Sequence, residues 1–158
     1  MALTNEELVI LRDDIASDPA FAGLPHNSDG AWAVAAAYNL QAVPDFYLWK
    51  NTLSTADCKT AMVWTEFIGR TAGEREAWQF MLSNGEINPS DVNVRQGIAD
   101  IFSGPSGLQS RTNLVAIAKR LATRIQKLFA VGTGSASVPA TATVESISYQ
   151  DVQDAWGL

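Results

Sequence analysis

The stretch SRTNLVAIAKRLATRIQKLF, residues 110–129, determines the predicted fold. Its large and small apolar residues recur every three or four positions, which places them on one face of a helix. They are Leu114, Ile117, Ala118, Leu121, Ala122, Ile125 and Leu128. At a rise of about 1.5 Å per residue, a helix over residues 111–129 is roughly 28 Å long and can cross a small domain. We therefore expect a long central helix with Leu121 and Ile125 in the core.

The opposite face of this predicted helix is cationic. It carries five of the chain's eleven basic residues, and no Asp or Glu occurs between Ile101 and Val144. The whole chain has a net charge of −6, so the residues outside the helix are strongly acidic. Such a separation of charge usually has a partner on at least one side. The candidate charged interface, or lining of a DNA channel, is Lys119, Arg120, Arg124 and Lys127.

The length and composition predict one globular domain. A chain of 158 residues can bury a core without a disulfide or a metal ion. Only 18% of its residues are charged, which is low for a monomer, so we expect other protein to cover part of its surface.

The remaining periodic segments predict a mainly α fold, a bundle of five to six helices with no sheet in the body. Capping-box spacings at Thr4 and Thr71 mark two of the helix starts, and prolines and glycines mark the breaks. The predicted helices cover residues 5–16, 29–39, 55–69, 71–84 and 89–102. We expect the aromatic residues of the irregular segment 40–53 to cap the core or to insert into a neighbour. The predicted helical body is 1–131.

Residues 132–158 are predicted to form an extended C-terminal arm ending in a short helix. Two nearby glycines follow the central helix, and small or apolar residues then alternate with polar ones at a period of two. No second strand is evident in the sequence, so we expect a neighbouring molecule to supply the partner strand. The alternative is a loosely ordered tail. The candidate interface with another subunit or a portal is Val138, Ala140, Ala142, Val144, Tyr149, Val152 and Trp156.

The sequence lacks the pattern of an enzyme. Cys58 and His26 are the only cysteine and histidine, and each has an ordinary structural interpretation, as a buried residue and as a turn residue. The paired acids of the first helix fall on its exposed side. We therefore expect no catalytic activity, no cofactor and no metal. The N-terminus has acids where a signal peptide has basic residues, and no apolar run is long enough for a membrane span. We expect an aqueous, cytoplasmic setting without a membrane partner.

Three segments carry a resemblance to a known family: LRDDIASDPAFAGL, VRQGIADIFSG and RLATRIQKLFAVGTGSASVPATATVESISYQDVQDA. Together they resemble small structural proteins of tailed bacteriophages, similar in plan to those of the head–tail junction. The resemblance extends from about Leu11 to Ala155 and rests on small and apolar residues without a catalytic motif. It implies a virion protein, made in the host cytoplasm. It also implies a ring of identical copies between the portal protein and an adjacent tail or neck protein.

Two functions of different classes follow. In the first, the chain is a head–tail connector (neck or adaptor) whose ring surrounds the DNA exit channel and makes non-specific contact with packaged DNA. In the second, it is a small DNA-binding or regulatory helical module that presents the basic helix 111–127 to phosphates. The predicted arm and the low charge content favour the connector.

Overall fold

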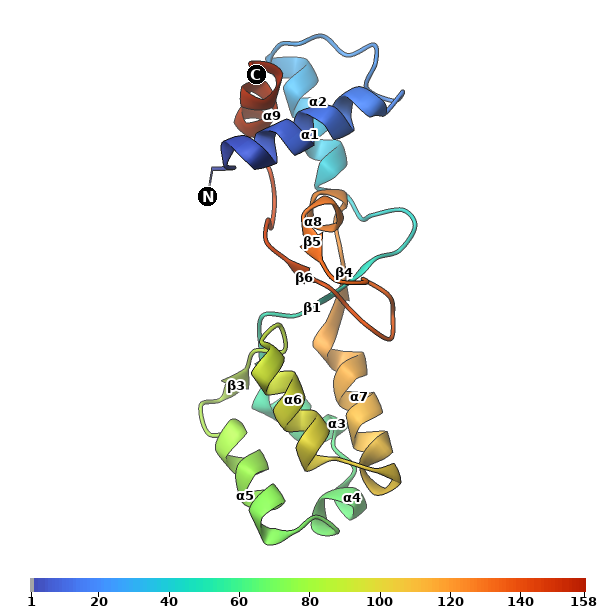
Figure 1. Ribbon diagram of the computed structural model, residues 1–158, viewed down its shortest axis with the longest axis vertical. Coiled ribbons are helices and arrows are strands. Elements are labelled where there is room, and N and C mark those ends of the chain that lie inside the picture. The colour runs from blue at the N-terminus through green and yellow to red at the C-terminus, as the bar shows by residue number, and fades with distance from the viewer. Residues whose placement is uncertain (1) are drawn as a thin grey trace. The chain divides into compact units, whose positions relative to one another are not determined.

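The structure is a computed structural model that describes residues 2–158, and it is mainly helical (Figure 1). The chain forms two compact units instead of the predicted single domain. Unit 1 comprises residues 1–46, 121–131 and 142–158, and unit 2 comprises residues 47–120 and 132–141. The chain therefore enters each unit more than once, so segments distant in sequence contribute to the same core.

Unit 1 is built from α1 (Asn5–Ser17), α2 (Ser28–Tyr38), α8 (Arg124–Leu128) and α9 (Tyr149–Trp156), with strand β5 (Ala130–Val131). The predicted capping box at Thr4 is present, since its side chain accepts the backbone N–H of Glu7 while the Glu7 carboxylate accepts that of Thr4. Ser148 and Asp151 form the same arrangement at the start of α9. Helix α9 packs against both α1 and α2.

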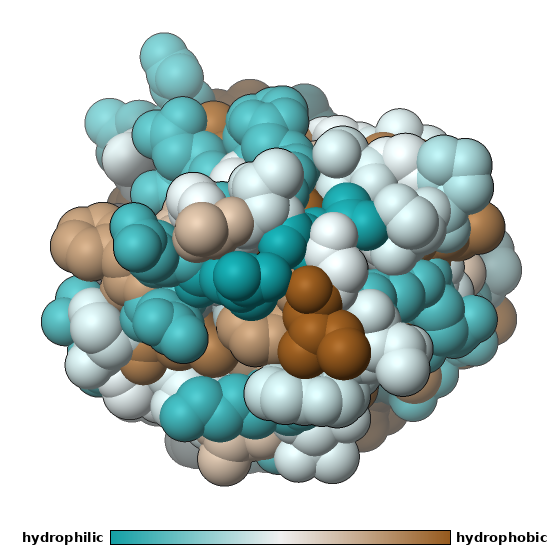
Figure 2. Space-filling view, turned by 90° about the horizontal axis from the view of Figure 1, so that it is seen from below, coloured by the Kyte–Doolittle hydropathy of each residue, from teal (hydrophilic) through white to brown (hydrophobic). Residues whose placement is uncertain are grey.

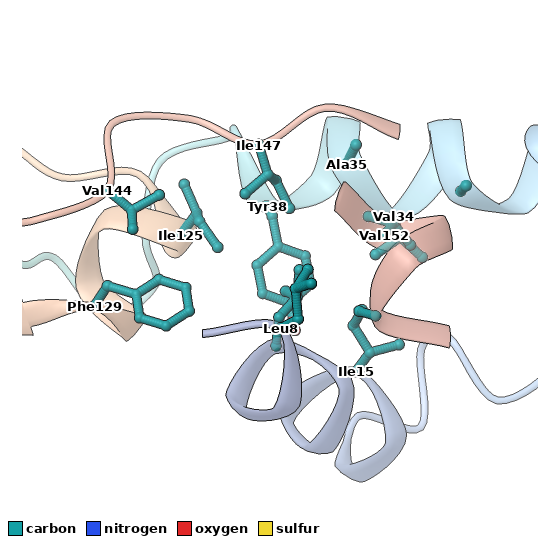
Figure 3. Packing of buried hydrophobic residues seen from close by; sticks show 13 residues of the cluster. Leu8, Ile15, Val34, Ala35, Tyr38, Ile125, Phe129, Val144, Ile147 and Val152 are labelled. Atoms are coloured by element: carbon teal, nitrogen blue, oxygen red, sulfur yellow. The ribbon is translucent and has the colours of Figure 1, made fainter. Parts of the chain in front are cut away.

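The core of unit 1 draws on every one of its chain segments (Figure 3). Leu11 and Ile15 come from α1, Val34 and Tyr38 from α2, and Val152 from α9. All are buried. The segment before α9 adds further apolar side chains, and α8 adds Ile125 and the adjoining Phe129. The C-terminal segment is thus part of the core of unit 1.

Unit 2 contains the remaining helices and a second, separate core. Its helices are α3 (Thr55–Ala61), α4 (Trp64–Ile68), α5 (Ala72–Met81), α6 (Val92–Ile101), the short 3-10 helix η1 (Pro105–Gly107) and α7 (Leu108–Ala118). The ring of Trp78 meets that of Phe102 edge-on, with centroids 5.2 Å apart, at the centre of this core. The predicted Thr71 capping box is present at the start of α5, where it pairs with Glu74.

Short two-stranded sheets correct the expectation of a body without a sheet. Strand β1 (Tyr47–Trp49) pairs with β4 (Lys119–Leu121), and β2 (Leu53–Ser54) pairs with β3 (Glu86–Ile87). Strand β6 (Thr141–Ala142) pairs with β5.

The predicted central helix over 111–129 is wrong, because it is two helices separated by extended backbone. Helix α7 ends at Ala118, and α8 begins only at Arg124. Between them, the Ala122 N–H donates to the Phe46 carbonyl and the Ala122 carbonyl accepts the Ala42 N–H, at 2.8 and 2.9 Å. The Thr123 side chain then caps α8. These bonds to another segment outweigh the helix propensity of the sequence between the two helices.

The break reverses one of the two core predictions made for this stretch. Ile125 is fully buried, as expected, but Leu121 is 40% exposed because extended backbone turns its side chain out of the apolar face. The predicted helix over 55–69 is also interrupted. Met62 and Val63 are extended, and the Val63 N–H donates to the Ser110 hydroxyl at 3.0 Å.

The predicted arm over 132–158 is likewise corrected, because both of its halves are held by the chain itself. In unit 2, Ala140 donates to the carbonyl of Tyr47 and accepts the N–H of Trp49, each at 2.9 Å. In unit 1, the Thr143 hydroxyl donates to the Phe129 carbonyl at 2.9 Å, ahead of α9. The pairing that was expected from a neighbouring molecule comes from β1, which meets the segment at Ala140, and from β5, which pairs with β6. The aromatic residues of β1 gave no alternating signal in the sequence.

Candidate functional site

The four predicted interface cations do not lie on one helix. Lys119 and Arg120 lie in β4 and belong to unit 2, whereas Arg124 and Lys127 lie in α8 and belong to unit 1. The periodicity that placed them on one helix ends at Ala118, where α7 ends. Each cation therefore has to be considered in its own surroundings.

Arg124 is held by carboxylates of its own unit. Its Nη1 donates to Asp18 Oδ2 at 2.6 Å and its Nη2 to Asp14 Oδ2 at 2.9 Å. The guanidinium also lies over the ring of Tyr38, 4.2 Å from the centroid, and over that of Phe21 at 5.1 Å. These contacts join α1, the turn after it, α2 and α8, so Arg124 has a structural role.

The titration of the groups around Arg124 reflects this arrangement. The pKa of Asp18 lies below its usual value because the Ala20 N–H and then Arg124 donate hydrogen bonds to its carboxylate. The pKa of the Tyr38 phenol is raised, first by burial and then by Asp14, to which the phenol donates a hydrogen bond. The Asp18 carboxylate and the Arg124 guanidinium are therefore both charged at neutral pH and compensate each other.

The other predicted cations lie against aromatic rings. Lys119 Nζ donates to the Ala136 carbonyl at 2.6 Å and lies 5.2 Å from the centroid of Tyr47. Lys127 Nζ lies 5.9 Å from the centroid of Phe46. Arg120 also takes part in an interaction within the structure. Among residues 2–158, no carboxylate forms a salt bridge with Lys127, so its charge is available to a partner.

The seven apolar residues predicted as an interface are mostly used within the chain. Ala140, Val144 and Val152 are buried, and Ala142, Tyr149 and Trp156 are half-buried. The ring of Tyr149 stacks on Trp32 at 4.8 Å, and the ring of Trp156 stacks on His26 at 4.4 Å. Val138 remains exposed, at 54%. The apolar side of α9, formed by Tyr149, Val152 and Trp156, is therefore an internal packing surface of unit 1.

A groove in unit 1 is the strongest candidate site that the structure adds. It has a volume of about 670 Å³ and lies between the end of α1, the segment after α2, and α8. Leu40 and Val43 line it although they are 67% and 90% exposed, and Lys127 and Leu128 line it from α8. The signal in the sequence was LQAVPDF, in which proline interrupts the helix between apolar residues. The expectation for this segment rested on its aromatic residues and did not include Leu40 and Val43.

The candidate chemistry of Cys58 is suppressed by its surroundings. The side chain is buried in α3, and burial followed by the nearby Asp57 raises the pKa of the thiol to about 11. The thiol is therefore protonated at neutral pH and is a weak nucleophile. Within residues 2–158, no group of three or more His, Cys, Asp or Glu side chains is arranged to hold a metal ion.

Over residues 2–158, every helix falls short of the length and apolar character that a bilayer span needs.

Comparisons of the chain with protein-family models, with curated proteins and with solved structures found no match.

Proposed function

We propose that the chain is a structural protein of a tailed-bacteriophage virion, a head–tail connector (neck or adaptor) that forms a homo-oligomeric ring between portal and tail. The observation that carries this proposal is the number of large apolar side chains left exposed on two units whose cores are already complete. The most exposed of them are Val43, Phe80, Val131, Leu40, Trp64, Val92 and Trp32. The resemblance to phage structural proteins supplies the kind of assembly.

These exposed residues lie outside the cores of both units. Trp64 and Phe80 are 64% and 80% exposed, while Trp78 and Phe102 form the centre of the core beside them. The face in Figure 2 shows hydrophobic surface surrounded by hydrophilic and neutral residues. Apolar surface framed by polar residues is typical of contacts between proteins, so these positions suit a chain that functions within an assembly.

The charges favour a protein-binding role over DNA binding. Unit 1 holds ten acidic and three basic residues, a net charge of −7, whereas unit 2 holds seven acidic and eight basic residues, a net charge of +1. An acidic unit repels phosphates. Arg124, one of the cations on which the DNA-binding alternative relies, is already paired with two carboxylates of unit 1.

The proposal differs in one respect from the plan implied by the sequence. Residues 142–158 belong to unit 1, so the contacts between copies come from the surfaces of the folded units and not from a free arm. A connector that docks through preformed surfaces changes little in shape on assembly and loses less conformational entropy than one that orders a tail.

The experiment is to purify tailed particles from cells in which the chain is expressed from its own genome and to quantify their proteins by mass spectrometry. The chain should copurify with the portal protein in a fixed, ring-like number of copies. Recovery of the chain in the lysate but not in the particles contradicts the proposal. Recovery on DNA, lost as salt rises, supports the DNA-binding alternative instead.

A further inference from the structure

We propose that the outer face of α1 of one copy docks in the unit 1 groove of the next copy. That copies of the chain form a ring is taken from the proposed function, on which this inference rests. It deepens that function by naming the two surfaces that meet. Both surfaces lie on the same compact unit, and each is apolar at its centre and charged beside it, with charges of opposite sign.

The outer face of α1 is the first surface. Glu6, Val9, Ile10 and Asp13 follow at spacings that place them together, opposite the buried residues of the same helix. All four are exposed, including Val9 at 37% and Ile10 at 47%. Glu7, between them in sequence, is used in the capping box. The face therefore presents an apolar pair with the Glu6 carboxylate one turn before it and, one turn after it, the Asp13 carboxylate, which is paired with Arg12.

The groove is the second surface. Leu40 and Val43 provide exposed apolar walls, and Lys127 provides a positive charge. Arg124 also lines the groove, but Asp14 and Asp18 compensate its charge. Lys127 is thus the cation of the groove that can still pair with an incoming carboxylate.

The charge pattern selects a second copy as the occupant. An isolated surface carboxylate contributes little, but a carboxylate that meets Lys127 as apolar surface is buried beside it fixes the register of a contact. Glu6 flanks the apolar pair of α1 and offers such a carboxylate, whereas Asp13 on its other side already forms a salt bridge with Arg12 at 2.9 Å. The four charged residues that line the groove, Asp14, Asp18, Arg124 and Lys127, sum to zero, whereas the rest of unit 1 has a net charge of −7, so α1 of another copy is repelled less at the groove.

The two surfaces differ, so the contact is head-to-tail. A contact of this kind leaves a free groove on one copy and a free α1 on the other, and repetition closes into a ring where the rotation permits. This is the symmetry that a connector requires.

The test uses charge reversal in the full chain, with self-association measured by sedimentation equilibrium. The groove variant is K127E and the helix variant is E6K/D13K. The matched controls are K59E on α3 and E76K/D100K on α5 and α6, which make the same changes of charge on unit 2. Circular dichroism checks that every variant retains its helical content.

Each of the two test variants should raise the Kd of self-association by about tenfold or more, and the controls should not. The triple variant E6K/D13K/K127E should associate more tightly than either parent. An equimolar mixture of the two test variants should also recover, because a head-to-tail contact lets each free surface find its match. Equal effects of tests and controls, or no recovery in the triple variant, overturn the inference.

A second measurement traps the contact directly. The variant I10C/V43C, oxidised at high protein concentration, should give a ladder of disulfide-linked species, while I10C/V92C should not. Cys58 does not interfere, because it is buried. A wild-type chain that stays monomeric at every concentration, together with no ladder, overturns the inference. The virion experiment tests the proposed function independently. If the wild-type chain is found in virions but K127E does not weaken self-association, these two surfaces are rejected and the connector function is retained.

Discussion

The substitution Val152→Ala tests whether the C-terminal helix belongs to the fold. Val152 is completely buried in the unit 1 core, on a helix that packs against α1 and α2. The change removes two methyl groups, each worth about 0.8 kcal/mol in transfer free energy. The cavity left behind adds to this loss because the surrounding helices relax only in part. We expect the free energy of unfolding to fall by about 2–3 kcal/mol.

The matched control is Val138→Ala, which makes the same chemical change at a residue that is 54% exposed. Its expected effect is below about 0.5 kcal/mol. Urea denaturation followed by far-ultraviolet circular dichroism measures the free energy of unfolding of both variants. The curves are checked for two separate transitions, because the two cores need not unfold together. If both variants unfold with the wild-type midpoint, α9 is not packed in unit 1. That result would restore the free arm expected from the sequence.

Three further predictions follow from individual side chains. Ile125→Ala should cost about 2–5 kcal/mol and Leu121→Ala about 1 kcal/mol or less; equal losses in urea denaturation would instead support one continuous helix. At about pH 8, Cys58 should not react with a thiol reagent while the protein is folded and should react once it is unfolded; rapid labelling of the folded protein would contradict its burial. The pKa of Asp18 is lowered by a backbone N–H and by Arg124, so the stability it contributes is present above the unfolded value near 3.8 and is lost as pH falls through the lower folded value. The variant D18N should therefore lose less stability than wild type below about pH 4, and parallel curves would refute this.

The features that could be predicted from the sequence were those fixed by local chemistry. Thr4 with Glu7 and Thr71 with Glu74 marked helix starts, because a capping box satisfies its hydrogen bonds within four residues. Ser148 and Asp151 form the same local arrangement at the start of α9.

The failures came from bonds between distant segments. Nothing in the neighbouring sequence indicates that Ala122 pairs with Phe46, so the regular apolar pattern predicted one long helix. Nothing near Ala140 indicates that it pairs with β1, so the alternating pattern predicted a free arm. The local signal that was missed is Thr123 with Gln126, the capping box that begins α8. The groove at Leu40 and Val43 depends on the position of α8 and could not be inferred without it.

The proposed role itself is tested most directly by the composition of purified tailed particles. Quantitative mass spectrometry should find this chain in a fixed ratio to the portal protein, with the ratio unchanged after the particles are treated with nuclease and washed in high salt. Absence of the chain from the particles, or its loss with the nucleic acid, would contradict a connector role.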